Sequence, residues 1–279
     1  MKILILGKNS QVGKSFPPKK NYIFISKKQA DITNFSKLKK KIISISPDII
    51  INLAAYNNVS NSETNFKKAF KVNCEGVKNL LKIINDKNIF LIHVSTDYVF
   101  SGRKNLSKTW KINSQRNPIN KYGLSKKLGE DLILKSKNNN CLIVRTSWVF
   151  SKYNENFVKK ILKLSQENKK IEVVSDQFGA PTSAQSLAKF LAYLTKNLIK
   201  IKRHKVVHFC NKPYCSWFYF AKTILKNNKN RINLRPVLTK NRTDNLKRPK
   251  NTMLDYEFTR KKLLYTQESW KKYLKGIYV

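Results

Sequence analysis

The sequence has few acidic residues, few histidines and few cysteines, and each shortage excludes a class of function. Sixteen Asp and Glu stand against 57 Lys and Arg in 279 residues, so the formal net charge is +41. The four cysteines include no C-x-x-C pair, and the three histidines are too scattered to form a metal site. We therefore expect no bound metal and a reduced, cytoplasmic compartment. His93 and His208 fall inside strand-like runs and are expected to be packed there.

Long hydrophobic runs are also missing. No apolar stretch approaches the roughly 20 residues of a transmembrane helix, and the short run Ile3 to Leu6 leads into Gly7 and not into a signal-peptide cleavage region. Hydrophobic residues still make up 41% of the chain, which is enough for a core. The sequence predicts a soluble protein without membrane contact, built as one large α/β domain or one domain with a smaller lobe.

The positive charge is spread along the chain instead of being gathered in one segment. The chain has 48 Lys but only 9 Arg, and no basic run is longer than the three residues from Lys39 to Lys41. Specific nucleic-acid binding favours the planar guanidinium of Arg, so we interpret the charge mainly as compositional bias. A nucleic-acid binder stays open as an alternative. The charge also predicts salt-sensitive attraction of anionic small molecules.

Short β-branched runs alternate with longer helical patterns. Strands that are apolar on both faces and separated by helices indicate an α/β fold with a doubly wound parallel sheet. Such a sheet binds ligands at the carboxyl ends of its strands. The expected strands are 2–6, 22–25, 49–53, 89–95, 141–145, 171–174 and 206–209, and the expected helices are 34–45, 63–84, 122–135, 156–166, 183–198 and 216–226.

The first strand is followed by a glycine turn. Gly7 and Gly13 occupy the first and last positions of a G-x-x-G-x-x-G frame, which aims helix N-terminal amides at a pyrophosphate. Ser10 stands where a middle glycine would allow closer approach, and Pro17-Pro18 limits the next helix to about two turns. The turn predicts weakened dinucleotide binding, with a plain tight turn as the alternative.

The residues about 20 positions beyond this turn bear on the choice of cofactor. An NAD site places an acid there on the adenine ribose, whereas this chain has Ser26-Lys27-Lys28. Two lysines could pair with a 2′-phosphate, so the sequence favours NADPH, with NADH as the alternative.

A tyrosine and a lysine lie four residues apart in an expected helix. Tyr122 and Lys126 therefore share one helical face. An unperturbed Tyr has a pKa of about 10, and a neighbouring ammonium lowers the pKa of a phenol toward the range where general acid catalysis works. Thr96 follows the fourth expected strand at the ligand-binding edge. A chance Tyr and Lys on an exposed helix is the alternative.

Further strings along the whole chain identify a family. With them the sequence resembles the dTDP-4-dehydrorhamnose reductase family of the extended short-chain dehydrogenase/reductase superfamily. The Tyr-Lys pair alone indicates the superfamily, and Arg145–Val149 with Asp176–Thr182 narrow it to this group. The strings are Gln11-Val12-Gly13, Asn52–Tyr56, Val72-Asn73, Ser95–Phe100, Asn117-Pro118, Arg145–Val149, Asp176–Thr182, Ser216-Trp217 and Arg248-Pro249 with Asn251, Leu254 and Asp255.

The resemblance implies a fold and a reaction. It implies a Rossmann-like dinucleotide-binding core over residues 1–150 and a smaller, mainly substrate-binding lobe over 151–279, with segments returning to the core. The reaction is NAD(P)H-dependent reduction of the 4-keto group of dTDP-4-dehydro-L-rhamnose to dTDP-L-rhamnose, a step toward surface polysaccharides. The resemblance allows a homodimer. Some members carry an acidic residue, linked to a metal-bridged dimer, near the position of Ser15, so we expect no such metal site here.

The resemblance also implies roles for individual residues. Tyr122 donates the proton, Lys126 holds the nicotinamide ribose and lowers the Tyr122 pKa, and Thr96 hydrogen-bonds the reacting oxygen. Tyr98 and Phe178 are expected in the core. The substrate-binding residues are Thr96, Asp97, Trp148 and Arg248, and the cofactor-binding residues are Gly7, Ser10, Gln11, Val12, Gly13, Asp31, Ile32, Ala54, Ala55, Tyr56, Tyr122 and Lys126.

Two further readings stay open. The chain could be a non-catalytic, regulatory member of the same fold, which loss of Tyr122 or Lys126 would have favoured, although both are present. It could also reduce a different 4-keto sugar nucleotide.

Overall fold

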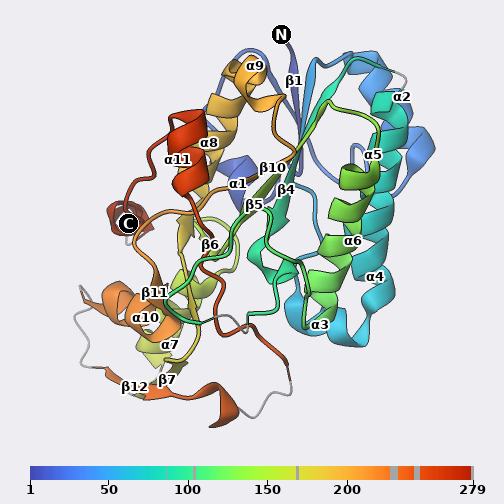
Figure 1. Ribbon diagram of the computed structural model, residues 1–279. Coiled ribbons are helices and arrows are strands. Elements are labelled where there is room, and N and C mark those ends of the chain that lie inside the picture. The colour runs from blue at the N-terminus through green and yellow to red at the C-terminus, as the bar shows by residue number, and fades with distance from the viewer. Residues whose placement is uncertain (86, 103–104, 168–169, 227–231, 242–245, 278–279) are drawn as a thin grey trace.

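Six parallel strands form the central sheet of the computed structural model, which describes residues 1–85, 87–102, 105–167, 170–226, 232–241 and 246–277. The strand order is β10-β5-β4-β3-β1-β2, and the sheet runs through the upper part of the molecule in Figure 1. This confirms the expected doubly wound α/β fold. The strands are β1 (Ile3–Leu6), β2 (Tyr22–Ile25), β3 (Ile49–Asn52), β4 (Phe90–Thr96), β5 (Cys141–Thr146) and β10 (Val206–His208).

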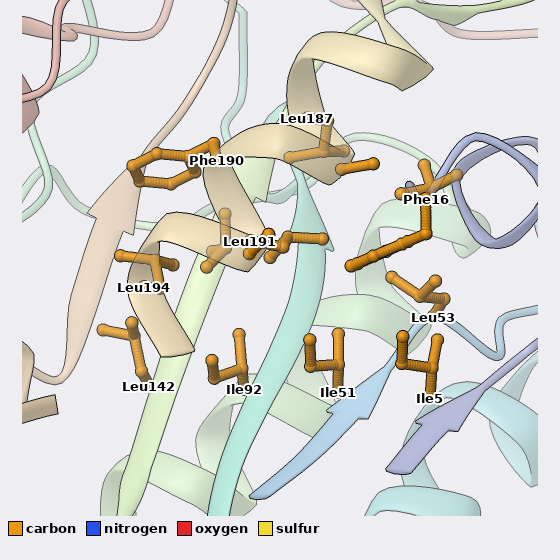
Figure 2. Close-up of a cluster of buried hydrophobic side chains, with 14 of the residues drawn as sticks. Ile5, Phe16, Ile51, Leu53, Ile92, Leu142, Leu187, Phe190, Leu191 and Leu194 are labelled. Carbon is orange, nitrogen blue, oxygen red and sulfur yellow. The ribbon is translucent and has the colours of Figure 1, made fainter. Parts of the chain in front are cut away.

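Alternate residues of each strand face opposite layers of helices. Ile5, Ile51 and Ile92 lie beneath α8 (Ala184–Lys196) in Figure 2 and belong to one buried cluster with its Leu187 and Leu191. The intervening residues of the strands pack against the other layer, and both faces of the sheet are buried. That layer consists of α2 (Phe35–Ile45), α5 (Gly76–Asn85) and α6 (Lys121–Lys135).

One expected strand lies outside this sheet. The segment 171–174 forms β7 (Lys170–Val174), which pairs in parallel with β12 (Asn233–Val237) in a separate two-stranded sheet. Lys170 and Glu172 are exposed while the residues beside them are buried. One face of this strand is therefore exposed to solvent, unlike the strands of the central sheet. The strand belongs to a peripheral lobe.

The expected helix 63–84 is divided into four pieces: α3 (Val59–Thr64), α4 (Phe66–Phe70), a π-helical segment η1 (Lys71–Glu75) and α5. Asn65 ends α3 and begins α4, because its side chain accepts a hydrogen bond from the Lys68 amide at 3.2 Å. Side-chain caps of this kind compete with helix continuation. The division was not predicted, and it turns Asn73 in the π-helical segment toward the site described below.

The lobe is built from residues after β5, and it lies at the lower left of Figure 1. Its core contains Phe150, Ile161, Phe220 and Trp270. It contains three two-stranded sheets that are separate from the central sheet. Its elements are β6 (Val149–Phe150) with β9 (Thr182–Ser183), β8 (Phe178–Gly179) with β11 (Cys215–Ser216), the β7–β12 pair, α7 (Phe157–Glu167), α10 (Trp217–Leu225), η3 (Thr239–Asn241), α12 (Lys271–Leu274) and η4 (Lys275–Ile277).

The chain returns from this lobe to the core. After α8 and α9 (Leu198–Ile201), β10 adds to the sheet beside β5, and α11 (Glu257–Leu263) packs near β10. His93 and His208 are fully buried within strands, as expected. Across the described ranges, no helix has the length and apolar character required to cross a membrane.

Candidate active site

A cleft of about 630 Å³ opens at the carboxyl ends of the sheet strands. The strand order reverses between β1 and β3, so the connections of these two neighbours leave in opposite directions and a crevice opens there. Three segments that are distant in the sequence meet in this cleft: the turn after β1, the end of β4 and the start of the lobe. Its walls include Ser10, Gln11, Val12, Ala55, Thr96, Asp97, Tyr98, Tyr122, Lys126, Trp148 and Trp217.

The glycine turn forms one wall. Gly7 has φ +94°, a conformation that side chains rarely adopt, and a Cβ on Gly13 would lie 2.4 Å from the Gly7 carbonyl oxygen. The following helix α1 (Gln11–Lys14) has a single turn, which confirms the expected early end before Pro17. Ser10 caps this helix, because its Oγ accepts a hydrogen bond from the Gly13 amide at 3.0 Å.

The segment after β3 is held by two asparagines. The Asn52 Oδ1 accepts a hydrogen bond from the Ala54 amide at 3.1 Å. Asn73 accepts from the Tyr56 amide and donates to the Tyr56 carbonyl, each at 2.9 Å, and also donates to Ser125 Oγ on α6 at 2.9 Å. The segment from Ala54 to Tyr56 is thereby fixed between the sheet and the helix that carries Tyr122.

The end of β4 brings three side chains to the cleft. Thr96 donates from Oγ1 to the Asp97 Oδ1 at 2.9 Å, and both residues are buried. Burial raises the pKa of the Asp97 carboxyl to about 7. Tyr98 was expected in the core, but it lines the cleft, with its ring edge-on to Tyr122 at 5.7 Å. The turn into a short 3₁₀ segment, η2 (Asp97–Val99), directs it there.

Tyr122 differs from the sequence expectation in its acidity. It is half-buried beside Thr96, and desolvation raises the pKa of its phenol to about 12, although the hydrogen bond with Thr96 opposes that rise. The expectation that Lys126 lowers this pKa is not met in this structure. The Lys126 ammonium donates to the Val94 carbonyl at 2.8 Å and lies 3.4 Å from His93 Nε2.

Lys126 is itself perturbed. Only 2% of the residue is exposed, and this burial lowers the pKa of its ammonium to about 8, against an opposing effect of Glu130 one turn further along α6. The ammonium is therefore mostly protonated at neutral pH, but it loses its charge within a unit or two above it.

Two tryptophans form another part of the cleft wall. Trp148 follows β5, and Trp217 begins α10 in the lobe. Trp148 has φ +46°, and a Cβ on Gly179 would lie 2.5 Å from its ring. Bulky residues at positive φ are uncommon and concentrate at functional sites.

A buried ion-pair network lies behind the cleft. Glu130 accepts two bonds from Arg145 Nε and one from its guanidinium NH2 at 2.8 Å. Arg116 donates to the same carboxylate at 3.1 Å. Arg145 also donates to the Ile112 carbonyl and contacts His208. The network joins α6, β5 and the loop before α6.

Several predicted site residues do not line this cleft. Gly7 and Gly13 shape the turn behind it, and Ala54 and Tyr56 belong to the braced segment. Asp31 accepts from Thr33 and pairs with Lys27 at 3.6 Å, and Ile32 is buried against Gly76. Arg248 is half-buried outside the lining. The proposed roles of these residues stay predictions. Phe178 was instead expected in the core, and it is only half-buried in β8.

Sequence reasoning assigned no site role to His93, Asn52, Asn73, Glu130 or Trp217. His93 and Asn52 face each other across β4 and β3 and are polar side chains at core positions, which was the available signal. The roles of these five residues depend on contacts between segments that are distant in the chain, and the sequence alone does not reveal such contacts. The described part of the chain contains no cluster of three or more His, Cys, Asp or Glu that could hold a metal.

Parallel sheets with a glycine turn after β1 and a binding crevice at the switch point are found in Rossmann-fold oxidoreductases. The Tyr122–Lys126 pair beside β4 narrows the class to the short-chain dehydrogenase/reductase type. A family model described as the RmlD substrate binding domain matches residues 1–278. The chain belongs to the dTDP-4-dehydrorhamnose reductase family.

Relatives support this assignment along the full length. A dTDP-4-dehydrorhamnose reductase of Aggregatibacter actinomycetemcomitans is 32% identical over 99% of this chain and 98% of the relative. A solved structure of a dTDP-4-dehydrorhamnose reductase from Clostridium acetobutylicum is 30% identical, with a TM-score of 0.92 over 100% of this chain and 98% of that one. The Bacillus anthracis enzyme, solved in complex with NADP, is 33% identical, with a TM-score of 0.90 over 100% and 99%.

Proposed function

We propose that this protein reduces the 4-keto group of dTDP-4-dehydro-L-rhamnose with NADPH to give dTDP-L-rhamnose. The observation that carries the proposal is the meeting of Thr96, Tyr122 and Lys126 in one cleft with the glycine turn on one side and Trp148 on the other. The relatives named for this reaction support the choice of substrate.

The turn after β1 fits a dinucleotide. Gly7 and Gly13 hold backbone so close that side chains at either position would fill the space or strain the turn. The amides of Ser10 to Val12 and the segment Ala54 to Tyr56 would hold the dinucleotide, with Lys126 on its nicotinamide ribose. When bound, the reduced nicotinamide supplies the hydride.

Tyr122 supplies the proton. Its pKa of about 12 keeps the phenol protonated at neutral pH, and an alkoxide formed at the former carbonyl carbon is basic enough to take that proton. Thr96 lies beside the phenol, and its single hydroxyl hydrogen, which Asp97 accepts in this structure, would turn to the oxygen on which charge develops. Lys126 lies on the same helical face with its ammonium bonded to the Val94 carbonyl, and its proposed role is to hold the nicotinamide ribose.

The substrate would lie between the core and the lobe. We propose that Trp148 provides a platform for the sugar, that Asp97 hydrogen-bonds it, and that Arg248 pairs with the diphosphate. This arrangement corresponds to a cofactor-binding core over residues 1–150 and a substrate lobe mainly over 151–279. The net positive charge of the protein would also attract the negatively charged substrate.

We further propose that Lys27 and Lys28 give a preference for NADPH. Lys27 is mostly exposed and pairs loosely with Asp31 at 3.6 Å, so it can turn to a 2′-phosphate. Replacing both by Ala should weaken NADPH binding about tenfold and leave NADH binding within about twofold. Equal losses for both cofactors would contradict this role. A cytoplasmic location and a homodimer stay predictions.

The main test is oxidation of NADPH on addition of dTDP-4-dehydro-L-rhamnose, with wild type compared with Tyr122→Phe. The variant should bind NADPH normally and lose about 100-fold or more in kcat, which is the usual contribution of a general acid. Tyr256→Phe, in the C-terminal part of the chain, is the matched control. Wild type that binds cofactor without turnover would favour the non-catalytic alternative, and equal rates would remove Tyr122 from the mechanism.

A further inference from the structure

His93 is a buried polar side chain that lies between Asn52 of β3 and Lys126, the proposed catalytic lysine. None of it is exposed. Its Nδ1 lies 3.1 Å from Asn52 Nδ2 on the neighbouring strand, and its Nε2 lies 3.4 Å from Lys126 Nζ on α6. The imidazole thus connects β3 to the helix through two nitrogen contacts.

The hydrogen bonds around Asn52 determine which imidazole nitrogen carries the proton. The Ala54 amide can only donate, so the Asn52 atom that faces it is the oxygen. The amide NH2 of Asn52 therefore faces His93 and donates to Nδ1. A neutral imidazole that accepts at Nδ1 carries its hydrogen on Nε2. Burial holds the pKa of His93 well below its usual range, which keeps the ring neutral.

The His93 N–H consequently points at the Lys126 amino group. An ammonium has three donors and no acceptor, so it cannot form a hydrogen bond with that N–H. One N–H of Lys126 is taken by the Val94 carbonyl. The remaining two N–H groups of the ammonium cannot donate to His93, so they are available to donate into the cleft.

We propose that His93 is a positioning residue: Asn52 holds it as the Nε2–H tautomer, and this N–H turns the Lys126 ammonium toward the cleft and limits the pH range in which it stays charged. The inference rests on the proposed role of Lys126. A neutral amine would accept the His93 N–H, so the same contact favours loss of the proton at high pH.

Other charged groups near Lys126 act in known directions. Glu130 on α6 favours the ammonium, and Arg145 on β5 partly neutralises Glu130. Tyr122 lies one turn earlier on α6, and Asp97 follows β4. None of these groups contacts the Nε2 of His93, so substitutions at Asn52 and His93 separate its effect from theirs.

The tautomer can be measured directly, because the chain has only three histidines. Two-bond ¹H–¹⁵N spectra of protein labelled in its histidines distinguish the protonated ring nitrogen. We expect His93 to carry its proton on Nε2 from pH 6 to 8.5. His208 is an internal contrast: Arg145 donates to its Nε2, so it should carry the proton on Nδ1. His93→Asn assigns the signals. A proton on Nδ1 of His93, or a cationic ring, would overturn the proposal.

Asn52→Asp tests the consequence for Lys126. A carboxylate oxygen in place of the NH2 can only accept, so the proton of His93 would move to Nδ1 and be donated to that oxygen. The Nε2 lone pair would then accept a hydrogen bond from the Lys126 ammonium. The high-pH limb of kcat should then move up by about one pH unit or more. Asn52→Asp combined with His93→Leu retains the added charge without the imidazole, and should show a smaller shift. An equal shift in both variants would assign the effect to charge alone. The spectra answer the tautomer question even if the enzyme proves inactive on this substrate.

Discussion

Trp148 and Trp217 stack with ring centroids 3.5 Å apart and planes within 10° of parallel, although 69 positions separate them in the chain. Trp148 closes the end of β5, and Trp217 opens helix α10 of the lobe. Phe157 also packs against Trp217, with ring centroids 4.4 Å apart. The stack supports a tryptophan with positive φ on the wall of the cleft.

Loss of the Trp217 ring should weaken binding of the sugar nucleotide more than binding of the cofactor. Trp217→Leu is expected to raise KM for the sugar nucleotide roughly 3- to 10-fold, since aromatic pairs contribute about 0.5–1.5 kcal/mol beyond area burial. NADPH affinity should change less than twofold. Steady-state kinetics and cofactor titration measure the two effects. Tyr219→Ala, an exposed position on the same helix, is the control. An equal loss for both ligands would point to general disturbance of the lobe.

The buried carboxyl of Asp97 should make stability depend on pH. Its pKa is raised to about 7, so between about pH 4 and 7 the unfolded chain loses a proton that the native state keeps. The contribution of Asp97 therefore favours the native state at low pH and declines as pH rises through this window. Asp97→Asn should raise the stability relative to wild type by more at pH 8 than at pH 4.5. The difference should reach at most about 4 kcal/mol, because each pKa unit is worth about 1.4 kcal/mol.

Urea unfolding at the two pH values tests this expectation. Asp48→Asn, at a carboxyl that is more than half exposed and precedes β3, is measured alongside as the control. A stabilisation by Asp97→Asn that is the same at both pH values would show that the Asp97 carboxyl does not titrate in this range.

Ser10 should restrain dinucleotide binding while it stabilises α1. Its Oγ occupies the Gly13 amide, and its side chain stands in the turn. Ser10→Gly should tighten NADPH binding roughly three- to tenfold, because a freed amide can donate to a charged oxygen. The stability should fall by only a few tenths of a kcal/mol, the usual cost of replacing a cap with glycine.

Isothermal titration measures the affinity. Asn34→Gly removes a comparable side-chain cap from α2 and should leave the cofactor affinity unchanged. Weaker binding by Ser10→Gly would instead show that the serine hydroxyl contributes a contact to the cofactor.

The buried Glu130 should be among the most sensitive positions for stability. Glu130→Gln leaves Arg145 and part of Arg116 without their carboxylate inside the protein. The expected loss is about 3–5 kcal/mol, the usual cost of breaking a buried ion pair from one side. Glu257→Gln breaks the exposed pair with Arg260 and should have no measurable effect. Chemical denaturation of both variants compares them, and equal midpoints would contradict the argument.

The sequence patterns predicted the elements of the central sheet well, because a strand buried on both faces must be apolar at successive positions. Ile49 to Ile51 show this directly. The pattern predicted β7 correctly as a strand but did not separate it from the central sheet, and its alternating exposure marks a lobe strand. The pattern failed for the helix 63–84, where Asn65 competes with helical hydrogen bonding. Tyr98 was placed in the core because an aromatic residue after a strand usually packs inward.

The site was predictable to the extent that its residues follow strands. Thr96 and Trp148 stand directly after β4 and β5, and Tyr122 and Lys126 share a helical face at a fixed spacing. Their acidities were not predictable. The pKa of Tyr122 rises instead of falling, because desolvation outweighs the hydrogen bond with Thr96, while the Lys126 ammonium is held by the Val94 carbonyl.

By itself the sequence determined the parallel sheet, the glycine turn and the Tyr-Lys pair, since each depends on residues that are close in the chain or on periodic burial. Tertiary structure alone decided that His93 faces Lys126, that Trp217 supports Trp148, and that Glu130 is enclosed by Arg145 and Arg116. These contacts join segments from different strands and from the lobe. Their energies depend on burial and distance, and both arise only when the sheet, its helices and the lobe have packed together.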